Sequence, residues 1–387
     1  MAEDYYYESQ IDKDHEWEQY LKEPKSGNFE AVLNMIKAQV GIALLALPYG
    51  FYNSGIGYGS IIQSLSVLFS LYGIRKLILI ADEVQKPKLY YPELVEQILG
   101  EKVEVFAYAG VQAGDLEIIV ITAIILVPFI FINNFHFLNT SSGFAIILMI
   151  FSLVYILIYD LQEIEQYNIG INSNSQQFFK IEGAIPIIGL AIFNCEGITC
   201  VFHIRDSMKK QSDFMKLFSL VLLFLLILQI IFGSINVFTF GKNLQEIVLL
   251  NIPYTDVYSF IAKIGYATGI LLSYPIQIFP VYTLLQQSMK MEDLSTAQIY
   301  KVYGVRMSLL ASLFLVAYMI PEFSGLLSFL GAVSGVATQM TFPLWMDYVY
   351  QKNHKSKFLK YFDLSLLGLS IVLMVVCGYS TLKDLFI

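Results

Sequence analysis

Long apolar stretches, separated by short polar connections, recur along the whole 387-residue chain. A helix needs about 20 predominantly apolar residues to cross the hydrocarbon core of a bilayer, whereas the cores of soluble proteins give shorter runs. The pattern therefore predicts an all-α, polytopic membrane helix bundle. The candidate spans are residues 28–50, 57–82, 105–133, 143–159, 184–204, 214–238, 256–286, 302–320, 322–348 and 362–382.

Composition agrees with a membrane protein. Hydrophobic residues make up 56% of the chain and charged residues only 14%, with a mean hydropathy of +0.60; a soluble chain must cover its surface with more charge. We therefore expect two parts, a polar tail over residues 1–27 and a transmembrane domain over residues 28–387, in contact with membrane lipids.

The tail is acidic and rich in aromatic residues. Its composition is that of a solvated segment, but its aromatic residues also suit a docking segment for protein partners. Both alternatives stay open. The aromatic residues are Tyr5, Tyr6, Tyr7, Trp17 and Tyr20.

Several classes of chemistry have no support in the sequence. The three cysteines all fall in apolar spans and the four histidines are scattered, so neither a disulfide framework nor a metal site is expected. There is no phosphate-binding loop and no nucleophile elbow. We expect no enzyme activity, no cofactor and no nucleic-acid partner.

Basic residues alternate between the connections and indicate orientation. The positive-inside rule places the basic connections, and with them the N-terminus, on the cytosolic or matrix side. The basic loops 73–104 and 205–216 should then share a side, yet three candidate spans lie between them. Either a further crossing lies in residues 161–183 or the two halves have an unusual relative orientation. The basic residues are Arg75, Lys76, Lys86, Lys88, Arg205, Lys209, Lys210, Lys216, Lys290, Lys301, Arg306, Lys352, Lys355, Lys357 and Lys360.

The stretch KAQVGIALLALPYGFYNSG, residues 37–55, resembles the first helix of the amino acid/auxin permease family. The chain matches that pattern at Lys37, Gly41, Leu45, Leu47, Pro48 and Gly55, while Ala43 replaces its second glycine. Three later stretches are similar to the sixth, eighth and tenth helices of the family. They are FNCEGITCVFHIRDSMKK, LLSYPIQIFPVYTLL and LSFLGAVSGVATQMTFPLW.

The resemblance implies an inverted-repeat fold of the leucine-transporter type, with broken first and sixth helices. Most members have eleven helices, and the fifth is the one that this sequence lacks, because residues 161–183 stand where it should be. This segment is too polar to face lipid.

A broken helix exposes free N–H groups in mid-membrane, which suit a carboxylate. We expect the carboxylate of a substrate near Gly41, Ile42, Ala43, Leu44 and Leu45. We expect the amino group near Phe193, Asn194, Glu196 and Gly197.

Two residues are candidates for the coupling ion. Glu196 is an acid inside an apolar span, where such residues are functional candidates; it binds the amine, relays a proton, or serves as a structural acceptor at the Gly197 break. Ser273 is a candidate sodium ligand, although a serine in a span more often bonds to its own helix.

Two functions remain. The first is secondary active transport of a small neutral amino acid by alternating access, coupled to H⁺ or Na⁺. The alternative is a transporter fold retained as an accessory subunit of a larger complex, such as an organellar inner-membrane assembly, which Ala43, the lacking helix and the aromatic tail favour. The expected location is the mitochondrial inner, vacuolar or plasma membrane.

Overall fold

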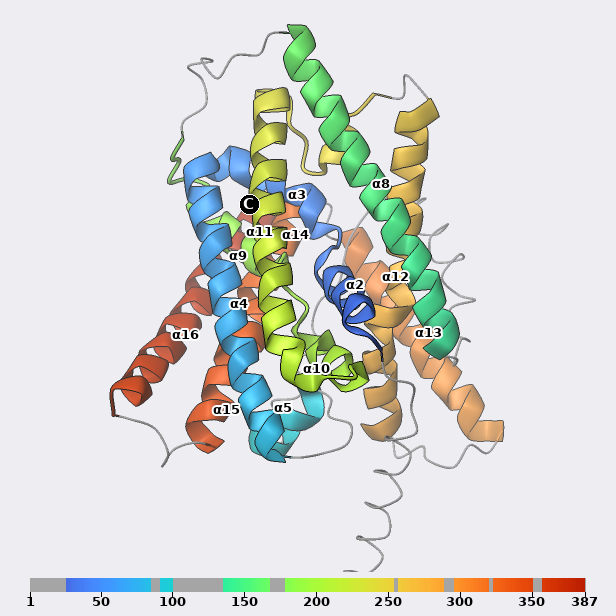
Figure 1. Cartoon of the computed structure of the whole chain (residues 1–387), viewed down its shortest axis with the longest axis vertical. Helices are drawn as coiled ribbons and strands as arrows, with labels where there is room; N and C mark the ends of the chain where they lie inside the picture. The colour runs from blue at the N-terminus through green and yellow to red at the C-terminus, as the bar shows by residue number, and fades with distance from the viewer. Residues whose placement is uncertain are drawn as a thin grey trace, which may run out of the picture.

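The computed structural model describes residues 26–84, 91–99, 135–167, 178–253, 257–288, 296–319, 323–350 and 357–386. These residues form an all-α bundle (Figure 1). Within the described ranges, five helices are long and apolar enough to cross a membrane, by length and composition. The acidic tail and the predicted span 105–133 lie outside the described residues.

The first predicted span is two helices. Helix α2 covers Asn28–Gln39 and α3 covers Ala43–Ser54. Val40 ends α2 because its backbone is extended, with φ −92° and ψ 106°. Pro48 lies inside α3, and its missing N–H weakens the helix one turn further on. The predicted break around Gly41 is therefore present.

The predicted sixth helix is also two helices. Helix α9 covers Ala184–Phe193 and α10 covers Ile198–Ser207. Residues 194–197 join them in non-helical turns, and Gly197 precedes α10 with φ −147° and ψ 9°. This break, too, lies where the sequence predicts it.

The remaining helices follow the predicted spans closely. The residues Phe323–Tyr350 form one long span, in which two π-helical segments, η5 and η6, join α14 to α15. Such π segments occur often at functional sites. The bounds are α4 Ile56–Val84, α5 Tyr91–Leu99, α8 Phe135–Tyr167, α11 Phe214–Phe240, α12 Val257–Ser288, α13 Thr296–Met319, α14 Phe323–Leu330, η5 Gly331–Gly335, η6 Ala337–Thr341, α15 Phe342–Tyr350 and α16 Lys357–Phe386.

The two basic loops lie on one side of the bundle. The guanidinium group of Arg205, near the end of α10, pairs with the carboxylate of Asp82, near the end of α4. We call the side that holds Asp82 and Arg205 the basic side. On it, Ser26 also joins the loop after α10, since its N–H donates to the Ser207 carbonyl at 2.6 Å. The predicted grouping of these loops on one side is thus confirmed.

The sequence left open a further crossing in residues 161–183, and the described parts of this segment, 161–167 and 178–183, contain none. Helix α8 continues to Tyr167. Its C-terminal part lies at the end of the bundle opposite the basic side, as its Tyr159 ring shows by stacking on Phe240 at the end of α11, with ring centroids 6.4 Å apart. The chain at Lys180 is still at that end, where its N–H donates to the Ser54 carbonyl at 2.8 Å. The described parts of the segment therefore contain only the last turns of α8 and a loop, and α8 and α9–α10 cross in opposite directions (Figure 1).

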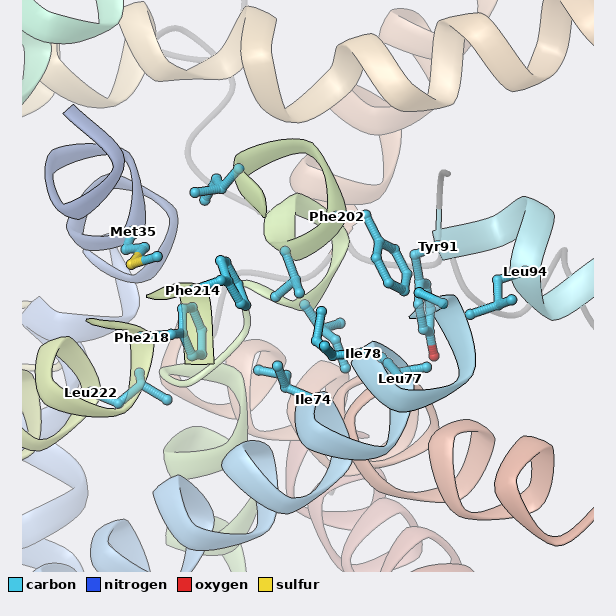
Figure 2. Close-up of a cluster of buried hydrophobic side chains, with 14 of the residues drawn as sticks. Met35, Ile74, Leu77, Ile78, Tyr91, Leu94, Phe202, Phe214, Phe218 and Leu222 are labelled. Carbon is cyan, nitrogen blue, oxygen red and sulfur yellow. The ribbon is translucent and has the colours of Figure 1, made fainter. Parts of the chain in front are cut away.

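A buried core holds the broken helices on the basic side. Side chains from α2, α4, α5, α10 and α11 converge there, as Figure 2 shows for Met35, Ile74, Phe202 and Phe218. Since lipid gives no hydrophobic drive between helices, close packing of such side chains stabilises the arrangement.

Helices α8 and α12 form a separate pair. Gly265 and Gly269 of α12 lie one turn apart and face α8, where Met149 and the Ala145 carbonyl approach Gly269. The hydroxyl of Ser152 donates to the Ala262 carbonyl at 2.7 Å across the pair. Small residues at this spacing let two helix backbones approach closely. Helix α12 of this pair also contacts the break in the first span.

Candidate functional site

The two helix breaks are in direct contact. The side chain of Gln39, the last residue of α2, packs on Gly197 so closely that a Cβ atom at position 197 would overlap the Gln39 Nε2 atom. A side chain at position 197 would therefore push the Gln39 amide away from the place where the breaks meet. By contrast, a Cβ atom at Gly41 would meet no atom of the described residues within 4 Å.

Two helix N-termini begin at the contact. Helix α3 starts at Ala43 and α10 starts at Ile198. Among the described residues, the N–H groups of Ile42, Ala43 and Ile198 donate to no backbone carbonyl. Free N–H groups and the positive end of the helix dipole together attract an anion. The breaks thus place two anion-attracting ends near each other.

Glu196 is the acidic group at the contact. It lies in the second break, where its N–H donates to the Phe193 carbonyl at 3.0 Å. Its side chain is partly accessible. Within the described part of the chain, its carboxylate has neither a hydrogen bond nor an ion pair. An acid without a partner in a membrane span is available for a cationic ligand or a proton.

Tyr266 of α12 reaches the first break. It is fully buried, and its hydroxyl donates to the Gly41 carbonyl at 2.8 Å. The same carbonyl accepts the Leu44 N–H at 3.3 Å. Both lone pairs of this oxygen are thereby used. Nothing in the sequence around Tyr266 distinguished it from other tyrosines, so its role needed the structure.

Carboxamide side chains surround the second break. Gln63 of α4 donates from Nε2 to Cys195 Sγ at 3.4 Å and to Gln229 Oε1 of α11 at 2.9 Å. Gln39 and Asn194 are buried, at 4% and 2% exposure. Asn194 was among the predicted site residues, whereas Gln39, Gln63 and Gln229 were not. Their position as polar residues within apolar spans was the sequence signal that could have identified them.

The other predicted residues fall into two groups. Gly41, Ile42 and Phe193 border the breaks and are partly accessible, whereas Ala43, Leu44 and Leu45 are buried in the first turn of α3. The hydroxyl of Ser273 donates to the Gly269 carbonyl of its own helix at 2.9 Å. In the described ranges, no cluster of histidine, cysteine and acidic residues could hold a metal ion.

Comparisons with known proteins agree with this arrangement. A family described as "Transmembrane amino acid transporter protein" matches residues 24–116 and 110–383. The chain is 27% identical over 292 residues to vacuolar amino acid transporter 3 of Saccharomyces cerevisiae, covering 68% of this chain and 42% of that protein. A Schizosaccharomyces pombe protein of the same name is 26% identical over 292 residues, covering 68% and 43%.

A plant relative aligns over more of its length. The amino acid transporter ANT1 of Arabidopsis thaliana is 22% identical over 343 residues, covering 77% of this chain and 79% of that protein. The chain spans less than half the length of the two yeast relatives. All these names are those of transporters rather than enzymes, and they give the accessory-subunit alternative no support. The chain belongs to the transmembrane amino acid transporter family.

Proposed function

We propose that this protein is a secondary active carrier that moves a small neutral amino acid across an organelle membrane. The observation that carries the proposal is the contact between the two helix breaks, where free N–H groups lie close to Glu196, an acid that has no partner among the described residues. A zwitterionic amino acid needs both kinds of group at once. The relatives named vacuolar amino acid transporters support the substrate class and an organelle location.

The N–H groups of Ile42 and Ala43 would hold the carboxylate of the substrate. They lie at the N-terminus of α3, where both hydrogen bonding and the helix dipole favour negative charge. The carboxylate of Glu196 would face the ammonium group from the second break. Two charged ends of one ligand would thus bridge the two broken spans, which gives the ligand a way to couple their movements.

A proton suits this site better than a sodium ion. Sodium would need carbonyl oxygens with free lone pairs at the break. The hydroxyl of Tyr266 already points its hydrogen at the Gly41 carbonyl, and Ser273 donates within α12. Glu196 remains as a group that can gain and lose a proton. We therefore propose coupling to protons, with alternating access to the two sides.

Reconstitution tests the proposal. Purified protein in liposomes should take up labelled neutral amino acids when a pH gradient is imposed, and Glu196→Gln should abolish that gradient-driven uptake. The matched control is Glu165→Gln, which changes an exposed acid near the end of α8 and should behave as the wild type. Unchanged uptake by Glu196→Gln, or uptake driven by sodium instead of a pH gradient, would contradict proton coupling through Glu196.

A further inference from the structure

We propose that Gln339 and Tyr91 are positioning residues for transport: Gln339 holds the turn that carries Glu196, and Tyr91 holds the helical segment that carries Gln339. The inference rests on the proposed function, because it assigns residues that keep the same site in shape. It comes from two backbone carbonyl groups that lack their usual helical donors and receive side-chain donors instead.

The first carbonyl belongs to Ile192, in the last turn of α9. In an α-helix it would accept the N–H of the residue four positions later, Glu196. Here the Glu196 N–H donates to the Phe193 carbonyl at 3.0 Å. The Ile192 carbonyl accepts instead from Gln339 Nε2 at 2.9 Å and from the Cys195 N–H at 3.1 Å. The buried Gln339 amide therefore takes the place of the donor that the break removes, and it fixes the turn that carries Glu196.

The second carbonyl belongs to Thr338, in the π-helical segment η6. The donor that would close an α-helical turn on it is the Phe342 N–H, which donates to the Ala337 carbonyl instead. The donor that would close a π-helical turn is residue 343, and Pro343 has no N–H. The Tyr91 hydroxyl donates to this carbonyl at 2.7 Å. Because a buried carbonyl without a donor costs free energy, Tyr91 stabilises the π-helical form of η6.

The two hydrogen bonds are coupled, because Thr338 and Gln339 are consecutive residues. Without the Tyr91 hydroxyl, the Thr338 carbonyl would regain a donor if the Phe342 N–H returned to it. That change takes the extra residue out of the π turn and rotates the helix on one side of the turn by roughly 100°, the angle of one residue. Such a rotation would take the Gln339 amide away from the Ile192 carbonyl.

Tyr91 also ties this segment to the core on the basic side. It is the first residue of α5 and is fully buried. Leu94 of α5 belongs to the same buried core as Phe202 of α10 (Figure 2), and α5 packs against α15, which follows η6. The position of α5 on the basic side is therefore linked, through Tyr91 and η6, to the turn that carries Glu196.

Hydrogen exchange of the purified full-length chain in detergent tests the inference without requiring a substrate. Gln339→Met keeps the length of the side chain but removes the donor, and it should speed exchange of the N–H groups in residues 192–197 by roughly tenfold. Tyr91→Phe should speed exchange of the same groups. The matched control is Tyr72→Phe, which removes a hydroxyl that donates to Asp363; it should leave exchange in residues 192–197 unchanged.

A rescue substitution tests the role of the Thr338 carbonyl. Pro343→Ala restores the N–H that can close a π-helical turn on this carbonyl. In combination with Tyr91→Phe it should return exchange in residues 192–197 toward the wild-type rate. Should Gln339→Met fail to fold, Gln339→Asn, whose amide is one methylene shorter, should still speed exchange there.

Uptake of labelled L-alanine by proteoliposomes gives the functional readout. Gln339→Met and Tyr91→Phe should each raise the KM by roughly tenfold and change the maximal rate less, since Glu196 would face the ammonium group in a shifted position. The double variant should have the KM of Gln339→Met alone, because Tyr91 acts through Gln339. Tyr72→Phe should keep the wild-type KM even if its melting temperature falls as far as that of Tyr91→Phe.

Three outcomes would overturn the inference: exchange in residues 192–197 that Tyr91→Phe leaves unchanged, equal effects of Tyr91→Phe and Tyr72→Phe on these residues, or no rescue by Pro343→Ala. Failure of the proposed function looks different. The exchange pattern would then follow Gln339, Tyr91 and Pro343 as described, but wild-type proteoliposomes would take up no amino acid.

Discussion

The ammonium group of Lys76 lies 3.1 Å from the Asp347 carboxylate, and both side chains are almost completely buried. Asp363 contacts the same ammonium group at 3.1 Å and accepts a hydrogen bond from the Tyr72 hydroxyl. This network joins α4, which packs against both broken spans, to α15 and α16. The charged groups therefore tie the site-bearing helices to the last two helices of the chain.

Replacing Lys76 with methionine should strongly destabilise the protein. The change leaves two buried carboxylates near each other without the Lys76 ammonium group, and removing one partner of a buried ion pair costs about 3–5 kcal/mol. The melting temperature of the variant in detergent should fall clearly below that of the wild type. Adding Asp347→Asn and Asp363→Asn should restore part of the loss; an unchanged melting temperature in Lys76→Met would count against the network.

The two break glycines should respond differently to alanine. Gly197→Ala forces the Gln39 side chain away from the contact, whereas Gly41→Ala adds a methyl group to open space. We expect Gly197→Ala to lower amino-acid uptake by about tenfold or more, as small displacements of binding groups do, with a folded protein by gel filtration. Equal effects of the two substitutions would show that the contact between the breaks is unimportant.

The close packing of α9 on α14 and η5 should not tolerate an added methyl group at Gly189. A Cβ atom at Gly189 would overlap the Ser328 carbonyl oxygen, which belongs to the backbone and cannot rotate away. Gly189→Ala should therefore reduce stability by about 1–3 kcal/mol, as overpacking does. Gly368→Ala, where a Cβ atom meets nothing within 4 Å, is the control, and thermal unfolding that is the same for both variants would contradict the packing.

Labelling of introduced cysteines should show which end of α9–α10 lies on which side of the membrane. Glu182 and Lys210 are both exposed, at opposite ends of α9–α10. With the basic side facing the cytosol, a membrane-impermeant thiol reagent added to intact organelles should label Lys210→Cys and not Glu182→Cys. The wild type controls for the native cysteines. Labelling of both variants from one side would rule out the crossing of α9–α10.

The sequence predicted the breaks well because their causes are local. Gly41, Pro48 and Gly197 interrupt apolar runs whatever the rest of the chain does, and the length of each apolar run indicates a span. The end of α8 was harder, since its last turns, from 161 to 167, carry polar residues that a search for apolar runs assigns to a loop.

Contacts between distant segments were not predictable from one sequence. Lys76 and Asp363 are 287 positions apart, and Tyr266 and Gly41 are 225 positions apart. Gln39 looked like an ordinary polar residue near the end of a helix. Its burial against Gly197 depends on how the two broken spans pack, which the sequence of either span does not show.

The most direct measurement of the central claim is amino-acid exchange in proteoliposomes without any ion gradient. Vesicles that contain the wild-type protein and an unlabelled neutral amino acid should accumulate the same labelled amino acid from outside, and Glu196→Gln should exchange it more slowly, since it lacks the carboxylate that faces the ammonium group of the substrate. Exchange by the wild-type protein that is no faster than in protein-free vesicles, for every neutral amino acid tried, would contradict the account.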